Sequence, residues 1–599
     1  MLNFLSKKPF TYDPITIFSI IGSILIALFT LYFIHSFGVN VPLQDEWDFI
    51  PFAEIVLNDG PFWEYPNFWQ HNDHRPVFPS LIIYFSILLT SWNFLFLMYF
   101  GWVLVALSVL IIFSILKETF PKLIWLILPI SAIMFNIAQY ENFLWAFTSV
   151  EWFLVSSSLI FSVYFLNKIK NNNLMIIPAS IFGIIATFSG IAGLLIWFIG
   201  IFTVFSLSRN KKTFISIWIL ISTLIFIIYF YDFIPTNSFE GNNFEFLSVA
   251  GIVYFLSYLS NGLILKFEIL KISIGFILFI GILTPVLFFI KKNNIYYNFI
   301  PWFQLGLAGF FSAGFATFGR FSDTGYIPAR YITQSTFDQI SALVILTVTI
   351  FLIYENLHNK NYKKILKIIF IMLFLFMAIS LSSSYYIGWI KGSELHDQTL
   401  SFQQCLQNKI FEFKCPSPDN WALPNLVYSH AKILEKLNLE PFHDKPIETI
   451  PDYLLDNVSW NVMGSTTKVI GEIEIIKTDT RVKPLSSLTE NIFIKQYGLL
   501  QIAGWADLME DNVENTSVYV FIDDEVHSKA YHGILRKDLS DYGLGTRSFS
   551  GWSGIIDLNE LTFGCHDVSI RILNDNIYAE ILHDKKICIE DINLIGDKQ

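Results

Sequence analysis

The sequence predicts a polytopic α-helical membrane protein in which a smaller, β-rich extracytoplasmic domain follows the helices. Apolar residues make up 53% of the 599 positions and the mean hydropathy is +0.51, values above those of ordinary globular proteins. Long stretches before residue 390 carry no charge, whereas the residues after it are richer in Asp, Glu and Asn. We therefore expect a membrane domain over 1–390 and a water-exposed part over 391–599.

Eleven apolar stretches are long enough to cross a bilayer as helices, which takes about 20 residues each. They are 15–36, 94–116, 121–138, 145–166, 174–190, 191–208, 213–231, 271–290, 299–318, 333–354 and 365–386. Two more, 77–91 and 247–265, are expected to stay outside without crossing, because counting both would place three basic clusters outside. A count of thirteen spans is the alternative.

Basic residues predict the orientation, since loops rich in Lys and Arg stay in the cytoplasm. These clusters are Lys7/Lys8, Lys117/Lys122, Lys168/Lys170, Arg209/Lys211/Lys212, Lys291/Lys292 and Lys363/Lys364/Lys367. With eleven spans, all of them and the N-terminus are cytoplasmic, and the C-terminal part is extracytoplasmic. No small-residue cleavage site follows the first span, so we expect it to be retained. Frequent Ile, Asn, Lys and Phe favour an AT-rich bacterial source, hence the bacterial plasma (inner) membrane.

The C-terminal part is expected to contain two segments. Residues 391–500 look like a mixed connector with a helix near 425–438, and residues 501–599 predict a small β-sandwich. In the second segment, apolar and polar residues alternate over 517–522 and 567–572 between Asp, Asn and Gly, which is typical of antiparallel strands. Trp505 and Trp552 are interpreted as core residues in preference to a sugar-stacking face.

All four cysteines lie beyond the last expected span, in the part assigned to the oxidising compartment. An even number there favours disulfides over free thiols. Closeness in sequence favours Cys405 with Cys415, and Cys565 with Cys588 would join neighbouring strands, although four cysteines allow three pairings.

The first external loop, residues 37–76, carries the most informative charges. Asp45, Glu46 and Asp48 come shortly after the first span. Carboxylates beside hydrocarbon are energetically unfavourable unless they bind or react with something. We therefore expect Asp45 and Glu46 to be catalytic and Asp48 to contact substrate, while Glu54 and Glu64 are interpreted as solvated acids.

A second group in the same loop reads His71, Asn72, Asp73, His74 and Arg75. His71, Asp73, His74 and Arg75 are predicted to contact substrate. The alternative is a divalent metal held by His71, Asp73 and His74, but the following Pro76 favours an extended segment over a helix that would align both histidines.

Four residues from distant segments are predicted to reach the same face of the membrane. They are Glu141, Arg320, Arg330 and Tyr331, all assigned to substrate binding. Either arginine, or Arg75, could hold a phosphate through paired N–H donors, and ordinary anchoring at the membrane interface is the alternative. Glu141 and Glu151 both lie near the opening of a predicted span, and Glu141 is the better candidate for a substrate contact.

These residue types suit a transfer reaction at the membrane surface. A carboxylate can act as general base towards an acceptor hydroxyl, and an arginine can stabilise the charge on a departing phosphate. Sugar transfer from a lipid-linked donor needs both parts. The net charge of −11 argues against a nucleic-acid partner.

The layout resembles the GT-C superfamily of membrane glycosyltransferases, in particular protein O-mannosyltransferases and aminoarabinose transferases of lipid A. Residues 10–390 carry the resemblance through the Asp45–Glu46 pair after the first span, the long first loop and about eleven spans. The resemblance implies a polyprenyl-phosphate sugar donor and an inverting transfer on the external face to a cell-surface glycan or lipid acceptor. It also implies Asp45 as base and Glu46 as its partner or as a ligand of the acceptor. The segment 71–75 departs from the common pattern of the family.

Two other classes of function remain as alternatives. A transporter or flippase of a lipid-linked glycan would place its site at mid-membrane on broken helices, with internal repeats that we do not find. A membrane-anchored glycan-binding protein would need neither eleven spans nor an acidic first loop.

Overall fold

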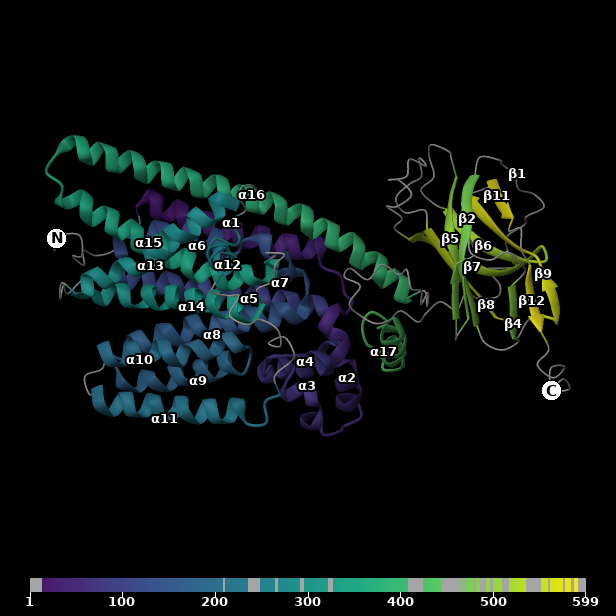
Figure 1. Ribbon diagram of the computed structural model, residues 1–599, viewed down its shortest axis with the longest axis horizontal. Helices are drawn as coiled ribbons and strands as arrows, with labels where there is room; N and C mark the ends of the chain where they lie inside the picture. The colour runs from purple at the N-terminus through teal and green to yellow at the C-terminus, as the bar shows by residue number, and fades with distance from the viewer. Residues whose placement is uncertain are drawn as a thin grey trace. The chain divides into compact units, whose positions relative to one another are not determined.

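The structure is a computed structural model that divides into two compact units, Met1–His396 and Asp397–Gln599, which we describe separately (Figure 1). It describes residues 13–207, 211–234, 248–263, 268–290, 296–320, 327–407, 424–443, 464–465, 469–478, 481–484, 492–495, 499–508, 516–534, 551–557, 561–574, 577–582 and 586–590.

The first unit is helical. Its helices are α1 (Pro14–Phe37), α2 (Ile50–Leu57), α3 (Pro66–Trp69), α4 (Val77–Thr90), α5 (Phe94–Thr119), α6 (Ile127–Met134), α7 (Tyr140–Leu144), α8 (Ala146–Lys168), α9 (Ile176–Thr187), α10 (Leu195–Leu207), α11 (Lys211–Phe230), α12 (Val249–Leu259), α13 (Glu268–Ile290), α14 (Tyr296–Arg320), α15 (Ile332–Asn356) and α16 (Lys360–Gln407), which continues beyond the unit. Short 3-10 helices include η1 (Gln44–Phe49) and η9 (Ala329–Tyr331).

Among the described residues, nine helical segments are long and apolar enough to cross a membrane, so the multi-pass character is confirmed. Two of the eleven expected spans, 174–190 and 191–208, contain only the short helices α9 and α10. The stretches 77–91 and 247–265 contain α4 and α12. The 14 residues of α4 rise about 21 Å, less than the hydrocarbon thickness of about 30 Å, which agrees with leaving this stretch out of the span count.

Helix α8 lies at the centre of the unit. It packs against α5, α9, α10 and α14, and its apolar window is 78% buried, compared with 11% for α16. The α5–α8 contact is close because Gly101 faces Ser149, where an added Cβ would lie 2.0 Å from the hydroxyl oxygen. Groups near the beginning of α8 are therefore held by a rigid central helix.

Helix α16 covers α1 at the edge of the unit (Figure 1). Trp389 stacks on Phe29 and meets Phe37 edge to face, with ring centroids 5.7 and 4.8 Å apart. His396 Nδ1 lies 3.1 Å from the Phe37 carbonyl oxygen. These contacts fix the end of α1 from which the first loop starts.

The second unit contains α17 (Pro424–Lys436), which confirms the helix expected near 425–438, and a set of strands. The strands are β1 (Gly464–Ser465), β2 (Val469–Thr478), β3 (Arg481–Pro484), β4 (Ile492–Lys495), β5 (Leu499–Leu508), β6 (Thr516–Ile522), β7 (Glu525–Ile534), β8 (Gly551–Asp557), β9 (Gly564–His566), β10 (Val568–Asn574), β11 (Ile577–Leu582) and β12 (Ile587–Glu590). The described strands thus begin at Gly464, within the expected connector 391–500. Strand β2 of this segment pairs antiparallel with β5 and so belongs to the sheet.

The described strands form a nine-stranded sheet in the order β1-β11-β10-β6-β7-β8-β5-β2-β3 and a three-stranded sheet, β4-β12-β9. Cys565 of β9 and Cys588 of β12 are directly paired residues and form a disulfide, which confirms that expected bridge. Cys415 lies outside the described residues. Trp505 and Trp552 are buried, as expected for core residues.

Candidate functional site

In the first loop, the three acids Asp45, Glu46 and Asp48 lie on a short helix that follows a tight turn. Gln44 has a φ of 43° and opens the helix η1, which contains Asp45, Glu46 and Asp48. Further on, His71 and His74 exchange backbone hydrogen bonds of 3.1 and 3.0 Å around Asn72, whose φ is 51°. The left-handed region suits Asn better than most side chains, so the sequence favours this turn locally.

Asp45, Asp48 and His71 form a cluster in which one ligand atom of each lies within 4.8 Å of the others. His71 Nε2 is 3.2 Å from Asp48 Oδ2. The His71 ring is buried against Phe49 and Phe147, with centroids 5.4 and 5.7 Å apart, while the Asp48 side chain is about half exposed. We call these three residues the acid–histidine cluster.

The donors of the acid–histidine cluster fit a divalent cation, since two carboxylates and an imidazole are common metal ligands. It is the only such group found among the described residues. The set differs from the expected His71, Asp73 and His74, because the two-residue turn between the histidines places His74 opposite His71 in a β-bridge. Asp48, from the neighbouring helix η1, lies beside the His71 imidazole.

Glu46 points away from this cluster and binds backbone. Its two carboxylate oxygens accept hydrogen bonds of 2.6 Å from Leu43 N–H and from Phe147 N–H in the first turn of α8. Only 2% of the residue is exposed, and burial raises the pKa of its carboxyl to about 8 despite the two N–H donors. This geometry makes Glu46 a link between loop and helix and leaves neither oxygen for a substrate, contrary to the expected catalytic role.

Arg75 is bound in a similar way. Its Nε donates to the carbonyl of Tyr229 at 2.7 Å, Nη1 to that of Trp69 at 3.4 Å and Nη2 to that of Tyr231. These bonds neutralise carbonyls at the end of α11, where a positive charge is also favoured by the helix dipole. All three guanidinium nitrogens donate to backbone carbonyls and only 8% of the residue is exposed, so a phosphate could reach the remaining N–H groups of Nη1 and Nη2 only after rearrangement.

Arg330 is held differently, by one carboxylate. Its Nη1 and its backbone N–H donate to Glu141 Oε2, at 3.3 and 3.1 Å. Nη1 is the only guanidinium nitrogen that donates to a described residue, and 30% of the side chain is exposed. The guanidinium also lies over the rings of Trp145 and Tyr331, about 6 Å from each centroid. Arg330 can therefore still offer donors to an anion.

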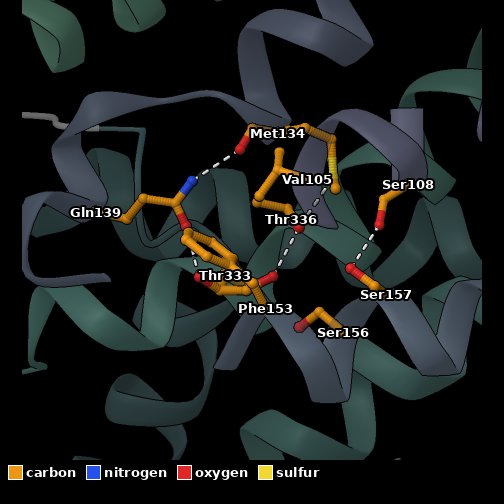
Figure 2. A pocket seen from close by; sticks show the side chains of 9 residues that line it. All are labelled: Val105, Ser108, Met134, Gln139, Phe153, Ser156, Ser157, Thr333 and Thr336. Carbon is orange, nitrogen blue, oxygen red and sulfur yellow. Dashed lines mark hydrogen bonds between the residues drawn. The ribbon is translucent and has the colours of Figure 1, made fainter. Parts of the chain in front are cut away.

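A polar network inside the bundle supports the Arg330 segment. Asn142 Nδ2 donates to the Arg330 carbonyl and to Thr333 Oγ1, both at 2.7 Å, and Thr333 donates to Gln139. Thr333 and Gln139 are also among the residues that line a small cavity with room for about one water molecule (Figure 2). Sequence reasoning alone does not assign a role to Asn142 or Thr333, because isolated amides and hydroxyls are common in membrane helices.

The acid–histidine cluster and the Glu141–Arg330 pair lie at the same end of the bundle. Glu46 binds Phe147, two residues beyond the Trp145 ring under Arg330. One turn further along α8, the buried Glu151 is within electrostatic range of both Asp45 and Arg330. We call this place the site end. The predicted convergence of the first loop and the segment around Arg330 is therefore present.

The remaining predicted residues occupy mixed positions. Tyr331 lies against Trp152 and Tyr258, with ring centroids 5.2 and 5.7 Å apart, and Asp73 is buried. Arg320 is the last residue of α14, and its side chain lies outside the described part of the structure. Glu151 is the weaker candidate of the two from sequence, although an acid six residues after the beginning of the apolar stretch 145–166 is a signal for it.

Comparison with protein-family models, with curated proteins and with solved structures found no match to this chain.

Proposed function

We propose that the protein is a membrane glycosyltransferase of the GT-C type, which moves a sugar from a polyprenyl-phosphate donor to a cell-surface glycan or lipid. The observation that carries this proposal is that the acid–histidine cluster and the Glu141–Arg330 pair both lie at the site end, where Glu151 is within electrostatic range of Asp45 and Arg330. The resemblance of the first loop and the multi-pass layout to the GT-C superfamily supports it. Eleven spans and a β-sandwich accessory domain belong to the same proposal.

In this mechanism Asp45 is the general base. Its carboxylate takes the proton from the acceptor hydroxyl as that oxygen attacks the anomeric carbon of the donor. The bond from this carbon to the phosphate oxygen breaks, and the phosphate leaves with the electron pair. Arg330 stabilises the charge on the leaving phosphate through its guanidinium donors. Attack opposite the leaving group inverts the configuration at carbon.

A divalent cation at Asp45, Asp48 and His71 would supply positive charge near the phosphate when bound. The protein's own contribution there is His71, which is fixed between Phe49 and Phe147 and orients the Asp48 carboxylate.

We also propose that the site end faces the extracytoplasmic side of a bacterial plasma membrane, with the N-terminus in the cytoplasm. The basic clusters support this orientation. The Cys565–Cys588 disulfide supports an oxidising environment for the C-terminal unit, because such bonds are rare in the cytosol.

Replacement of Asp45 by Asn tests the proposed base, since it removes the charge with little change in shape. With purified protein in lipid, a mixture of polyprenyl-phosphate sugars and an extract of cell-surface glycans and lipids as acceptor, we expect release of polyprenyl phosphate to fall about 10²–10⁴-fold, the usual range for loss of general base catalysis. Glu64→Gln is the control, because Glu64 is an exposed acid in the same loop. Full activity of Asp45→Asn, with normal activity of the control, would remove Asp45 as the base.

A transporter of a lipid-linked glycan is the second candidate function, because a buried acid, Asp338, lies within a membrane helix. The same assay separates the two classes of function. A transferase releases polyprenyl phosphate in detergent, where no membrane separates two compartments, and a transporter leaves the donor intact.

A further inference from the structure

Asp338 is a fully buried acid in the membrane unit. It lies on α15, eight residues after Arg330, and none of the residue is exposed. Neither of its carboxylate oxygens accepts a hydrogen bond, and no described cation forms an ion pair with it. Its place in the span Ala329–Asn356 puts it among apolar helices, away from the charged groups of the site end.

The contact around Asp338 is tight and contains other unpaired polar groups. An added Cβ on Gly309 of α14 would lie 2.8 Å from Asp338 Oδ1, and one on Gly306 would lie 2.5 Å from Ser341 Oγ. The hydroxyls of Ser341 and Ser312 are buried without a partner. By contrast, Thr317 on α14 bonds back to the carbonyl four residues earlier, at 2.7 Å, as hydroxyls in membrane helices commonly do.

Among the described residues, those that α12 and α13 place at this contact carry no positive charge. Helix α12 contributes Tyr254 and Tyr258, and Asp338 is within electrostatic range of Tyr258. Helix α13 contributes Gly281 and Ile282, which pack against α15 and α14. An ionised carboxylate in such surroundings is strongly unfavourable, because nothing replaces its hydration.

From this arrangement we propose that Asp338 is a proton-binding site, which holds a proton as a neutral carboxylic acid at neutral pH. The proton removes the charge that would otherwise lie in the α14–α15 contact. Because α14 ends at Arg320 and α15 begins two residues after Arg330, the bound proton favours the contact between the two helices that adjoin these arginines.

Infrared spectroscopy of the full chain in lipid tests the proposal without any assay of transfer. A protonated carboxyl has a C=O stretching band that an ionised carboxylate lacks. We expect such a band at neutral pH in the wild-type protein, and we expect Asp338→Asn to lose the aspartic-acid component. Asp59→Asn is the control, because Asp59 is exposed in the first loop and should contribute no such band.

A measurement on the wild-type chain covers the case in which Asp338→Asn does not fold. Labelling the aspartate side-chain carboxyl carbons with ¹³C shifts the band of a protonated aspartic acid and leaves those of glutamic acids, such as the buried Glu46 and Glu151, unchanged. A shifted component at neutral pH supports the proposal. Its absence, or a wild-type band that persists unchanged in Asp338→Asn, would overturn it, whether or not the protein transfers sugars.

Discussion

Charged side chains at the site end fall into two regions that differ in what they bind. In one region, Glu46 and Arg75 are buried and bind backbone N–H and carbonyl groups with all their polar atoms. In the other, Asp48 and Arg330 are partly exposed, and the carboxylate or guanidinium of each has one charged or titratable partner at close range, His71 and Glu141 respectively. The difference shows that a charged residue near a candidate site can have a purely structural role.

The largest effect on stability is expected for Arg75→Ala. The change leaves the carbonyls of Trp69, Tyr229 and Tyr231 without their donor, and a buried unsatisfied group costs about 1–3 kcal/mol. We expect a loss of about 3 kcal/mol, seen as a lower melting temperature in detergent. Arg75→Lys should recover part of it. A normal melting temperature together with weaker donor binding would place Arg75 with the substrate-binding groups.

A smaller loss, about 1–3 kcal/mol, is expected for Glu46→Gln, because the NH2 group of glutamine cannot accept from either Leu43 N–H or Phe147 N–H, whereas both oxygens of the glutamic acid can, even when it is protonated. The pKa of Glu46 is raised from 4.5 to about 8, so the folded state binds this proton more tightly than the unfolded state. Stability from this group is therefore lost as pH rises from about 4.5 to about 8. The gap in melting temperature between wild type and variant should narrow over that range; a constant gap would contradict the burial argument.

Arg330→Ala should affect donor use more than stability. Loss of a charge-assisted hydrogen bond of about 1.5–3 kcal/mol corresponds to a rise of about 10–100-fold in the KM for the polyprenyl-phosphate donor. The KM for the acceptor should stay near that of the wild type, and the melting temperature should change little because the side chain is partly exposed. Equal changes in both KM values would contradict the phosphate assignment.

The smallest effect concerns the C-terminal unit. Burial would lower the pKa of His566, but hydrogen bonds to Asp523 and the Thr562 carbonyl raise it above 6.5. Burial would raise the pKa of Asp523, but His566 and the Asp567 N–H lower it below 3.8. The ion pair therefore stabilises the fold at pH values between the pKa of Asp523 and that of His566. This stabilisation is lost as pH rises through the pKa of His566 or falls through that of Asp523.

Hydrogen exchange of residues 561–574 in the full chain measures this effect. Exchange protection relative to His566→Asn should be largest at mildly acidic pH and should disappear in mildly alkaline solution. A difference that stays constant across this range would show that the ion pair does not contribute.

Much of the helical layout could be predicted from the sequence, because twenty-residue apolar stretches have few alternatives to a membrane helix. The break between 174–190 and 191–208 was predicted close to the turn that follows Thr187, but apolar content does not reveal that α9 and α10 are only 12 and 13 residues long. The early start of the sheet was missed because β2 pairs with β5 across about thirty residues, a relation that local alternation does not reveal.

The location of the candidate site could be predicted from the sequence, but the roles of its individual residues could not. The position of the acids after the first span pointed to the site end, but Asp45 and Glu46 are neighbours whose side chains have opposite environments. Only the contact with Phe147, about one hundred residues later, distinguishes them. The alternative metal set within 71–74 likewise differs from the candidate set in the structure, which combines His71 with two acids of η1, a combination that sequence spacing alone does not indicate.

The bond from Glu46 to the first turn of α8 has a consequence for the thermodynamics of ligand capture. A loop of this length would ordinarily lose conformational entropy when a ligand arrives, and that loss would weaken binding. Here the anchoring is complete before any ligand enters, because both oxygens of the carboxylate already hold the loop on the central helix. Association is therefore expected to resemble docking onto a preorganised surface, with its free energy drawn from contacts and little of it spent on ordering the chain.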